Sequence, residues 1–344
     1  MRKTTLALTA LFAASASSLL GQASANIAAG RTQPSPLAPS EIIAASPKAD
    51  WTAIAASDLL VMDLAPDAKG KPRRVVIQLM PPPFSQGWIG NIRKLAAAHW
   101  WDGTAINRVQ DNYVVQWGDP DADDKAKAKA LPAGLVTVPE SNYVTSLRYN
   151  RKGRQSVATL LNAYVIGLNG KVLEAGPNPV RFDPYGETGF IAGWPMAAGR
   201  APNIAWPVHC YGMVGVGRDL PPNTGTGAEL YTVIGHAPRH LDRNIALVGR
   251  VIEGIEYLSS LPRGHGALGF YDLAQGDERT GIVSIRLGTE VQGLPTYEYL
   301  STESASFAGY ADARANRRDA FFIRPAGGAD ICNIPVPVRR VSVK

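Results

Sequence analysis

The sequence predicts a mainly β fold, a closed barrel or a sandwich, and three observations support this. Short apolar runs rich in Val, Ile and Leu recur along the chain, bounded by turn residues. The 344 residues include 34 glycines and 26 prolines, which is high for a helical bundle and ordinary for a β-rich protein. Few segments show apolar residues at helical spacing. Hydrophobic residues form 45% of the chain, so a mainly disordered protein is excluded.

The first part of the predicted fold is a hairpin followed by a helix. Residues 59–64 and 74–80 are apolar runs, and the turn-forming residues 67–72 lie between them. The prolines at 81–83 end the second strand, because proline cannot donate a ladder hydrogen bond. Apolar residues at 88, 89, 92 and 95 then predict a helix that continues to about His99.

A second hairpin is predicted over residues 105–117, with its turn at the polar residues 110–112. Because side chains alternate along a strand, Val114 and Gln116 are expected on one face. Further strands are predicted over 211–217, 230–234, 246–251 and 281–287, helices over 252–261 and 297–318, a strand or short helix over 156–166, and an extended tail over 331–343. Residues 170–207 alternate turn residues with aromatics and allow no assignment.

The charge pattern argues against nucleic-acid binding. Lys and Arg exceed Asp and Glu by 35 to 29, a net charge of +6. The densest basic clusters are only the pairs 317–318 and 339–340, which are far shorter than the basic runs of nucleic-acid-binding segments. We therefore expect no nucleic-acid partner.

The N-terminus has the three parts of a secretory signal peptide. Arg2 and Lys3 form a positive region, residues 6–20 are apolar and small, and Ala23-Ser24-Ala25 fits the small-x-small cleavage rule. Residues 1–25 are therefore predicted to be removed, which would lower the net charge from +6 to +4 by loss of two basic residues. Residues 6–20 are too short to span a bilayer, so we expect an exported, periplasmic protein without membrane insertion.

Two cysteines, Cys210 and Cys332, are present. In an oxidising compartment an even pair favours a disulfide. Two buried free thiols are the alternative, because a sequence does not show whether two Cβ atoms approach.

Several short motifs recur in an order that resembles one known family. In chain order they are VVIQL (75–79), NIRKL (91–95), WDGT (101–104), NRV (107–109), VQWGDP (115–120), GVGR (215–218), GAELY (227–231), HLD (240–242) and VGRVIEG (248–254). Each motif alone is weak, but their order and spacing resemble the cyclophilin-type peptidylprolyl isomerases. The resemblance covers about residues 57–120 and 210–290. It implies a cyclophilin-like closed eight-stranded β-barrel with about two capping helices and inserted loops.

This resemblance organises the chain into five segments. They are the signal peptide (1–25), an N-terminal arm (26–56), the barrel (57–290), an insertion within it at about 121–209, and a C-terminal extension (291–344). The insertion and the extension are longer than a family core would need, so we expect them to decorate the barrel or contact a partner.

The resemblance implies catalysis of rotation about Xaa–Pro peptide bonds without a cofactor, on proline-containing polypeptides. Arg108 stands at the family's catalytic arginine, which donates to the prolyl nitrogen, and Gln116 stands where a side-chain amide holds the substrate backbone. The implied substrate-binding residues are Tyr113, Val114, Glu229, Tyr231, His240 and Leu241.

Some positions depart from the family pattern. His240 replaces a common Trp, Ile245 replaces a His, and Glu229 replaces a Gln. A client-binding or chaperone module with weak or no isomerase activity is therefore the alternative function, although the intact Arg108 and Gln116 favour the enzyme.

Two other kinds of site find little support in the sequence. His236 and His240 have the spacing of a metal pair, but Pro238 between them disfavours one helical face, so no metal is expected. A secreted hydrolase lacks support, because no serine lies in a glycine-flanked elbow.

Overall fold

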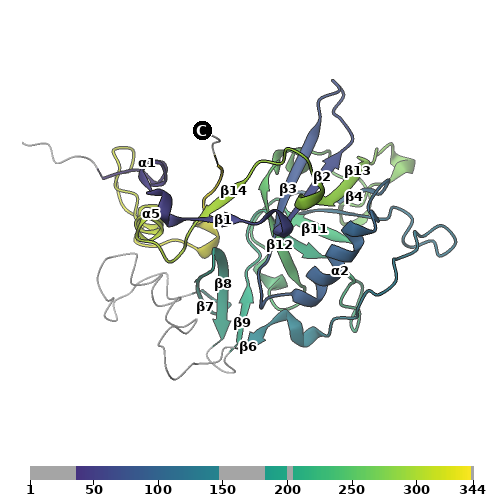
Figure 1. The fold of residues 1–344 in the computed structure, drawn as a ribbon, viewed down its shortest axis with the longest axis horizontal. Helices are drawn as coiled ribbons and strands as arrows, with labels where there is room; N and C mark the ends of the chain where they lie inside the picture. Colours follow the sequence, from purple (N-terminus) through teal and green to yellow (C-terminus); the bar gives the residue numbers. More distant parts are fainter. Residues whose placement is uncertain (1–35, 147–182, 200–203, 342–344) are drawn as a thin grey trace, which may run out of the picture. The chain divides into compact units, whose positions relative to one another are not determined.

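The computed structural model describes residues 36–146, 183–199 and 204–341, and its largest element is an eight-stranded antiparallel sheet (Figure 1). The strand order is β13-β2-β3-β12-β10-β11-β5-β4. The strands are β2 (Leu59–Leu64), β3 (Arg73–Leu79), β4 (Ala105–Val109), β5 (Val114–Gly118), β10 (Met213–Val216), β11 (Leu230–Val233), β12 (Leu247–Glu253) and β13 (Ile282–Leu287). The predicted hairpins β2–β3 and β4–β5 are both present.

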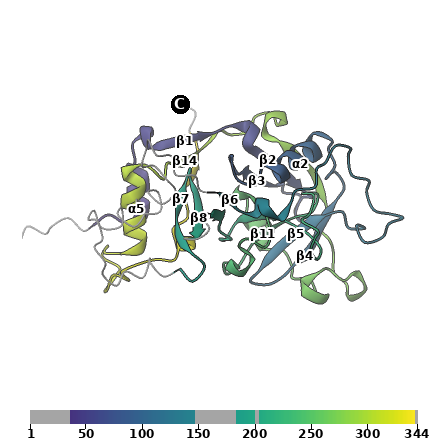
Figure 2. The same ribbon diagram turned by 90° about the horizontal axis from the view of Figure 1, so that it is seen from below.

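Backbone hydrogen bonds between the two edges turn this sheet into a barrel. The Ile106 amide on β4 donates to the Thr280 carbonyl just before β13 at 2.9 Å. The Ile282 amide on β13 donates to the Thr104 carbonyl at 2.8 Å. The expected eight-stranded barrel is therefore confirmed, and Figure 2 shows β4, β5 and β11 side by side on one flank.

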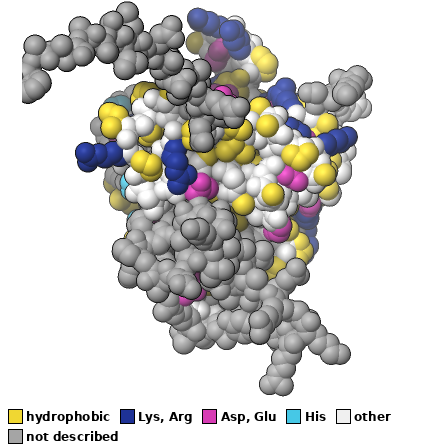
Figure 3. Space-filling view, turned by 90° about the vertical axis from the view of Figure 1, so that its left-hand side faces the viewer, with side chains coloured by type: hydrophobic (Ala, Val, Ile, Leu, Met, Phe, Trp, Pro, Cys, Tyr) yellow, Lys and Arg dark blue, Asp and Glu magenta, His cyan; other side chains and the backbone are white. Residues whose placement is uncertain are grey.

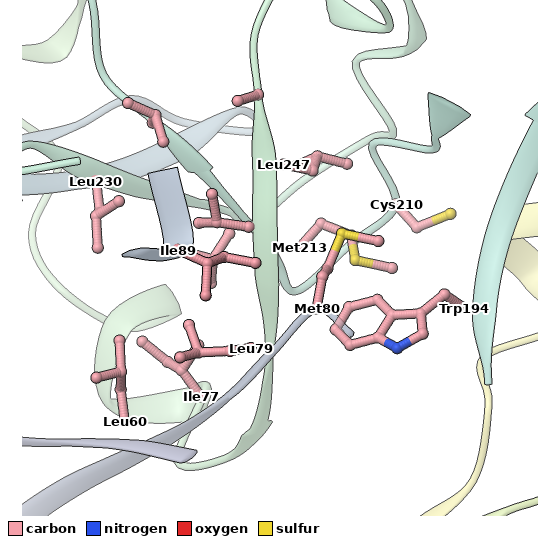
Figure 4. Packing of buried hydrophobic residues seen from close by; sticks show 14 of the residues in the cluster. Leu60, Ile77, Leu79, Met80, Ile89, Trp194, Cys210, Met213, Leu230 and Leu247 are labelled. Atoms are coloured by element: carbon pink, nitrogen blue, oxygen red, sulfur yellow. The ribbon is translucent and has the colours of Figure 1, made fainter. Parts of the chain in front are cut away.

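Helix α2 (Gln86–Ala97) contacts β12 and β13 through an apolar face. Its buried residues Trp88, Ile92 and Leu95 follow the helical spacing read from the sequence. The Trp88 indole also donates to the Thr224 carbonyl at 3.1 Å, which ties the helix to the loop before β11. Leu79 on β3 and Ile89 on this helix belong to the same core cluster (Figure 4).

Within the described part of the insertion lies a separate four-stranded sheet. Its order is β6-β9-β8-β7, from β6 (Thr145–Ser146), β7 (Glu187–Ile191), β8 (Trp194–Gly199) and β9 (Ile204–Pro207). Trp194 of β8 shares the barrel's core cluster, and Figure 4 shows its indole next to Met80, Met213 and Cys210. The inserted sheet thus packs on the barrel through apolar side chains.

Segments from both ends of the described chain form a third sheet, in the order β1-β14-β15. They are β1 (Trp51–Ile54), β14 (Tyr297–Leu300) and β15 (Val338–Arg340). Helix α1 (Pro39–Ala45) packs on α5 (Ala305–Ala315) beside it. The structure joins Cys210 to Cys332 in a disulfide with a Cα–Cα distance of 5.1 Å.

Two predicted helices differ from the structure. The helix predicted over 297–318 is strand β14 followed by α5, because the Ser304 side chain accepts from the Phe307 amide and starts the helix there. The helix predicted over 252–261 shrinks to α4 (Glu256–Ser259), because β12 continues to Glu253 and Gly254 turns the chain at a φ of +81°.

The remaining short elements are 3₁₀ turns. They are η1 (Lys48–Asp50), η2 (Ala56–Asp58), η3 (Glu140–Tyr143), η5 (Arg239–Leu241), η6 (Ala267–Gly269), η7 (Leu273–Gln275), η8 (Gly288–Glu290) and η9 (Ile331–Asn333). The predicted signal peptide and the strand or helix expected at 156–166 lie outside the described residues.

The surface and the helices of the described residues give two further observations. No helix within the described ranges is long and apolar enough to cross a bilayer. On the face drawn in Figure 3, Lys and Arg side chains lie in small groups among acidic and hydrophobic ones.

Candidate active site

A pocket of about 420 Å³ opens on the barrel flank formed by β4, β5 and β11. The predicted site residues that line it are Arg108, Tyr113, Val114, Gln116, Glu229, Tyr231 and Leu241. His240 is not among the lining residues, but its ring stacks on that of Tyr113 at a centroid distance of 6.3 Å. The structure therefore brings the predicted site residues together in one place, with His240 at the rim.

Arg108 and Gln116 face each other across the β4–β5 hairpin, where the strand register pairs them directly. The Arg108 Nη1 donates to the Gln116 Oε1 at 3.1 Å, and its Nε donates to the Leu268 carbonyl at 2.7 Å. Its Nη2 also donates to the Gln110 side chain. These contacts fix the plane of the guanidinium from three directions.

Two aromatic rings flank the same guanidinium. The Arg108 Cζ lies 5.6 Å from the centroid of the Tyr113 ring and 5.3 Å from that of Phe270. Burial lowers the pKa of Arg108, but a guanidinium remains charged in proteins. Within the described part of the chain no carboxylate forms an ion pair with Arg108, so its charge is available to a ligand.

The apolar wall of the pocket follows from strand alternation. Val114 and Gln116 share one face of β5, as expected, and Tyr231 on β11 is the register partner of Gln116. Val114 and Tyr231 belong to one small hydrophobic cluster, against which Tyr113 and Ile245 pack. Beside a fixed cation, the pocket thus offers a surface suited to an apolar ring.

Glu229 lies where two glycines leave room for its side chain. A Cβ on Gly118 would come within 3.2 Å of the Glu229 Cγ, and one on Gly217 within 2.9 Å. Burial raises the pKa of Glu229, while its hydrogen bond with Gln116 works in the opposite direction. The nearby carboxylate of Asp219 raises the pKa further.

Sequence reasoning missed the loop that completes the pocket. Leu268 and Phe270 contact Arg108 but lie about 160 residues further along the chain, on a loop around η6 without strand or helix periodicity. Leu268 adopts a φ of +57°, which is rare for a residue with a side chain. In the sequence this stretch shows only a Phe at 270 after the closely spaced glycines 264, 266 and 269.

Arg218, the last residue of the GVGR motif, also lines the pocket. No group of three or more potential metal ligands occurs among the residues that the structure describes. The pocket itself combines a charged donor and an amide with an apolar cup.

The comparisons with known proteins agree with this geometry. The family model described as cyclophilin type peptidyl-prolyl cis-trans isomerase/CLD matches residues 88–270, more than half of the chain. No curated protein matches the sequence.

Among solved structures, cyclophilin AquaCyp293 from Hirschia baltica aligns with a TM-score of 0.57 at 18% identity, covering 86% of this chain and 94% of that one. A cyclophilin-type isomerase from Cryptosporidium parvum, solved in the presence of the dipeptide Ala-Pro, aligns with a TM-score of 0.34 at 10% identity. That alignment covers 66% of this chain and 98% of the other. With its barrel, its pocket and the extent of the family match, the chain belongs to the cyclophilin-type peptidyl-prolyl cis-trans isomerase family.

Proposed function

We propose that this protein is a peptidylprolyl isomerase that acts on proline-containing segments of exported polypeptides. The observation that carries the proposal is the fixed Arg108 guanidinium beside Gln116, at the edge of an apolar cup. Membership of the family supports the reaction class.

The chemistry of the Xaa–Pro bond explains why such a site would accelerate its rotation. The rotation barrier is roughly 18–20 kcal/mol, because the nitrogen lone pair is delocalised into the carbonyl. In the twisted state the lone pair returns to the nitrogen, which becomes able to accept a hydrogen bond. A donor that contacts the nitrogen only in that state lowers the barrier without tightening ground-state binding.

Arg108 suits this role, because it offers a fixed N–H donor and keeps its charge. The Gln116 amide would hold the substrate backbone, and the cup of Tyr113, Val114 and Tyr231 would hold the proline ring. The residues on either side of the substrate proline would contact Glu229 and Leu241 in the pocket lining. His240, stacked on Tyr113, would form part of the rim of the cup.

We propose export to the periplasm as the setting, on the signal-peptide pattern of residues 1–25. The pairing of Cys210 with Cys332 supports an oxidising compartment, where disulfides persist. Proteins folding there would supply exposed Xaa–Pro bonds as substrates.

The test is NMR exchange spectroscopy on a short Ala-Pro peptide with the mature wild-type protein. Catalysed exchange between the cis and trans resonances is expected at substoichiometric protein. Peptide binding without faster exchange would instead support the alternative, a client-binding module with the cyclophilin fold.

A further inference from the structure

Behind the pocket, five buried polar side chains form a continuous chain. The Tyr231 hydroxyl lies 2.9 Å from the His209 Nε2, and the His209 Nδ1 lies 2.8 Å from the Asp242 Oδ1. The Arg239 Nε donates to the Asp242 Oδ2 at 2.6 Å, and its Nη1 donates to the Asp183 Oδ2 at 2.6 Å. The chain links the proline cup to the segment just before β7 of the inserted sheet.

The direction of each hydrogen bond follows from the charges. Burial opposes ionisation of Asp242, but its contacts with His209 and Arg239 outweigh burial and hold its pKa below the ordinary value. The ionised carboxylate only accepts, so the His209 Nδ1 carries the proton. Burial lowers the pKa of His209, so the ring is neutral and its Nε2 accepts from the Tyr231 hydroxyl.

The location of these groups separates them from solvent. His209 is 1% exposed and Tyr231 is 4% exposed, yet the Tyr231 side chain also lines the pocket. The ring therefore meets the pocket while its hydroxyl is tethered behind it. Each buried polar atom of this chain has a partner, as burial requires.

A glycine makes room for this arrangement. Gly215 on β10 is the register partner of Tyr231, and a Cβ there would come within 2.3 Å of the tyrosine hydroxyl oxygen. The side chain of Tyr231 thus passes over Gly215 to reach His209. The two rings are nearly parallel, at 7°, with centroids 6.4 Å apart.

We propose that His209 is a positioning residue that holds the Tyr231 ring in place as a wall of the proline cup. The inference rests on the proposed function and extends it, because His209 and Asp183 come from the insertion rather than from the barrel strands. If the Tyr231 ring is already fixed before the substrate binds, less conformational entropy is lost on binding. The tether is therefore expected to lower KM and to leave kcat nearly unchanged.

The central experiment compares His209→Leu with the double variant His209→Leu/Tyr231→Phe. The single change leaves the tyrosine hydroxyl buried without an acceptor, so KM for the Ala-Pro peptide should rise about tenfold with little change in kcat. The double variant also removes the unpaired hydroxyl, so its KM should lie below that of His209→Leu while staying above that of wild type, because the ring is no longer tethered. His209→Gln keeps an acceptor near the Nε2 position and should restore part of the loss.

Thr232→Val is the matched control, because Thr232 is a buried neighbour on β11 that donates to the Met213 carbonyl at 3.2 Å and does not line the pocket. It should lower stability without moving KM. Should His209→Leu not fold, His209→Gln provides the readout, since it keeps a polar acceptor but changes its reach to the Tyr231 hydroxyl and should still raise KM above that of wild type.

Three results would overturn the inference: an unchanged KM in the single variants, a double variant no better than His209→Leu, or a ¹⁵N NMR spectrum with the His209 proton on Nε2. Failure of the proposed function would look different. In that case the wild type shows no catalysed exchange, while the dissociation constant of the peptide and the His209 tautomer still follow the expected pattern.

Discussion

Arg108 is held by its neighbours more firmly than an ordinary surface arginine. Its guanidinium donates to Gln116 and to the Leu268 carbonyl and lies between the rings of Tyr113 and Phe270. Such a group needs little reorganisation when charge or a lone pair develops beside it, which is the condition for electrostatic catalysis.

Replacing Arg108 should therefore remove transition-state stabilisation while keeping the fold. Loss of one such donor is typically worth about 2.7–4 kcal/mol, so Arg108→Ala should lower kcat/KM roughly a hundredfold to a thousandfold. Arg108→Lys keeps the charge but not the planar fork and should recover little. The readout is NMR exchange with circular dichroism as the fold control, and wild-type activity in a folded Arg108→Ala protein would refute the mechanism.

Glu229 gives a second residue-scale prediction, on pH and stability. Its pKa is raised mainly by burial, so the folded protein binds this proton more tightly than the unfolded chain. Stability is then lost as pH rises from about 4.3, the ordinary glutamate value, through the raised value. The Glu229→Gln variant cannot ionise at this position and does not lose this stability. The difference between the unfolding free energies of the variant and of wild type should therefore shift in favour of the variant as pH rises across that window.

Urea unfolding between pH 4 and pH 8 measures this difference. Glu278→Gln serves as the control for the loss of one carboxylate, because Glu278 is an exposed glutamate outside the pocket. A constant difference between Glu229→Gln and wild type at all pH values would contradict a raised pKa.

At the scale of elements, the loop from Gly264 to Asp277 is the least regular part of the site and depends on one carboxylate. Asp277 accepts from the backbone amides of His265 and Asp272 at 2.9 and 2.8 Å and from the His265 ring at 2.5 Å. These hydrogen bonds lower the pKa of Asp277 to about 2. The same loop carries the Leu268 carbonyl that accepts from Arg108.

Asp277→Asn should loosen this loop and lower kcat/KM, roughly threefold to tenfold for hydrogen bonds of ordinary net strength. Because the folded pKa is depressed, the stability that the carboxylate contributes is present above pH 3.8 and is lost as pH falls towards 2. The gap in melting temperature between wild type and variant should therefore shrink below pH 3.8.

Asp111→Asn is the matched control for the loop variant. Asp111 is exposed and forms an ion pair at 3.0 Å with Arg263, the residue just before the same loop. Exposed ion pairs contribute little to stability, so Asp111→Asn should leave the loop and the activity unchanged. An equal loss of kcat/KM in Asp277→Asn and Asp111→Asn would contradict a specific role of the Asp277 hydrogen bonds, because the removal of any nearby charge would then have the same effect.

The disulfide joins the barrel to the C-terminal segment, and its loop length sets the expected effect. Cys210 and Cys332 are 122 residues apart in sequence. The chain-entropy model gives an upper limit of roughly 4–5 kcal/mol for closing a loop of this size. The double variant Cys210→Ser/Cys332→Ser should unfold at lower urea concentration by up to that amount, and thiol titration of the unfolded, unreduced wild type should find no free thiols.

At the scale of the whole molecule, export would be accompanied by cleavage of the N-terminal signal peptide. Removal of residues 1–25 would leave Asn26 as the first residue of the exported protein. N-terminal sequencing of protein recovered from the periplasm should begin at Asn26. Retention of Met1 in a cytoplasmic protein would contradict export.

Local sequence patterns were enough to predict most of the barrel. Strands β2, β3, β4 and β5 appeared as apolar runs bounded by turn residues, and their hairpin pairing followed from short connections. Arg108 and Gln116 were located through motifs in their family order, and strand alternation placed Val114 on the same face as Gln116. These features depend on residues that are close neighbours in the chain, so they can be predicted from local sequence spacing alone.

Long-range pairing decided the rest. Residues 297–300 are a strand because β14 hydrogen bonds with β1 and β15, which come from opposite ends of the described chain, and no local pattern marks such partners. The contacts of Leu268 and Phe270 with Arg108, and of His209 with Tyr231, join loops to strands that are distant in sequence. Local periodicity determined which segments form the barrel, whereas only tertiary packing decided which loops complete its pocket, because loop positions depend on contacts that sequence spacing does not encode.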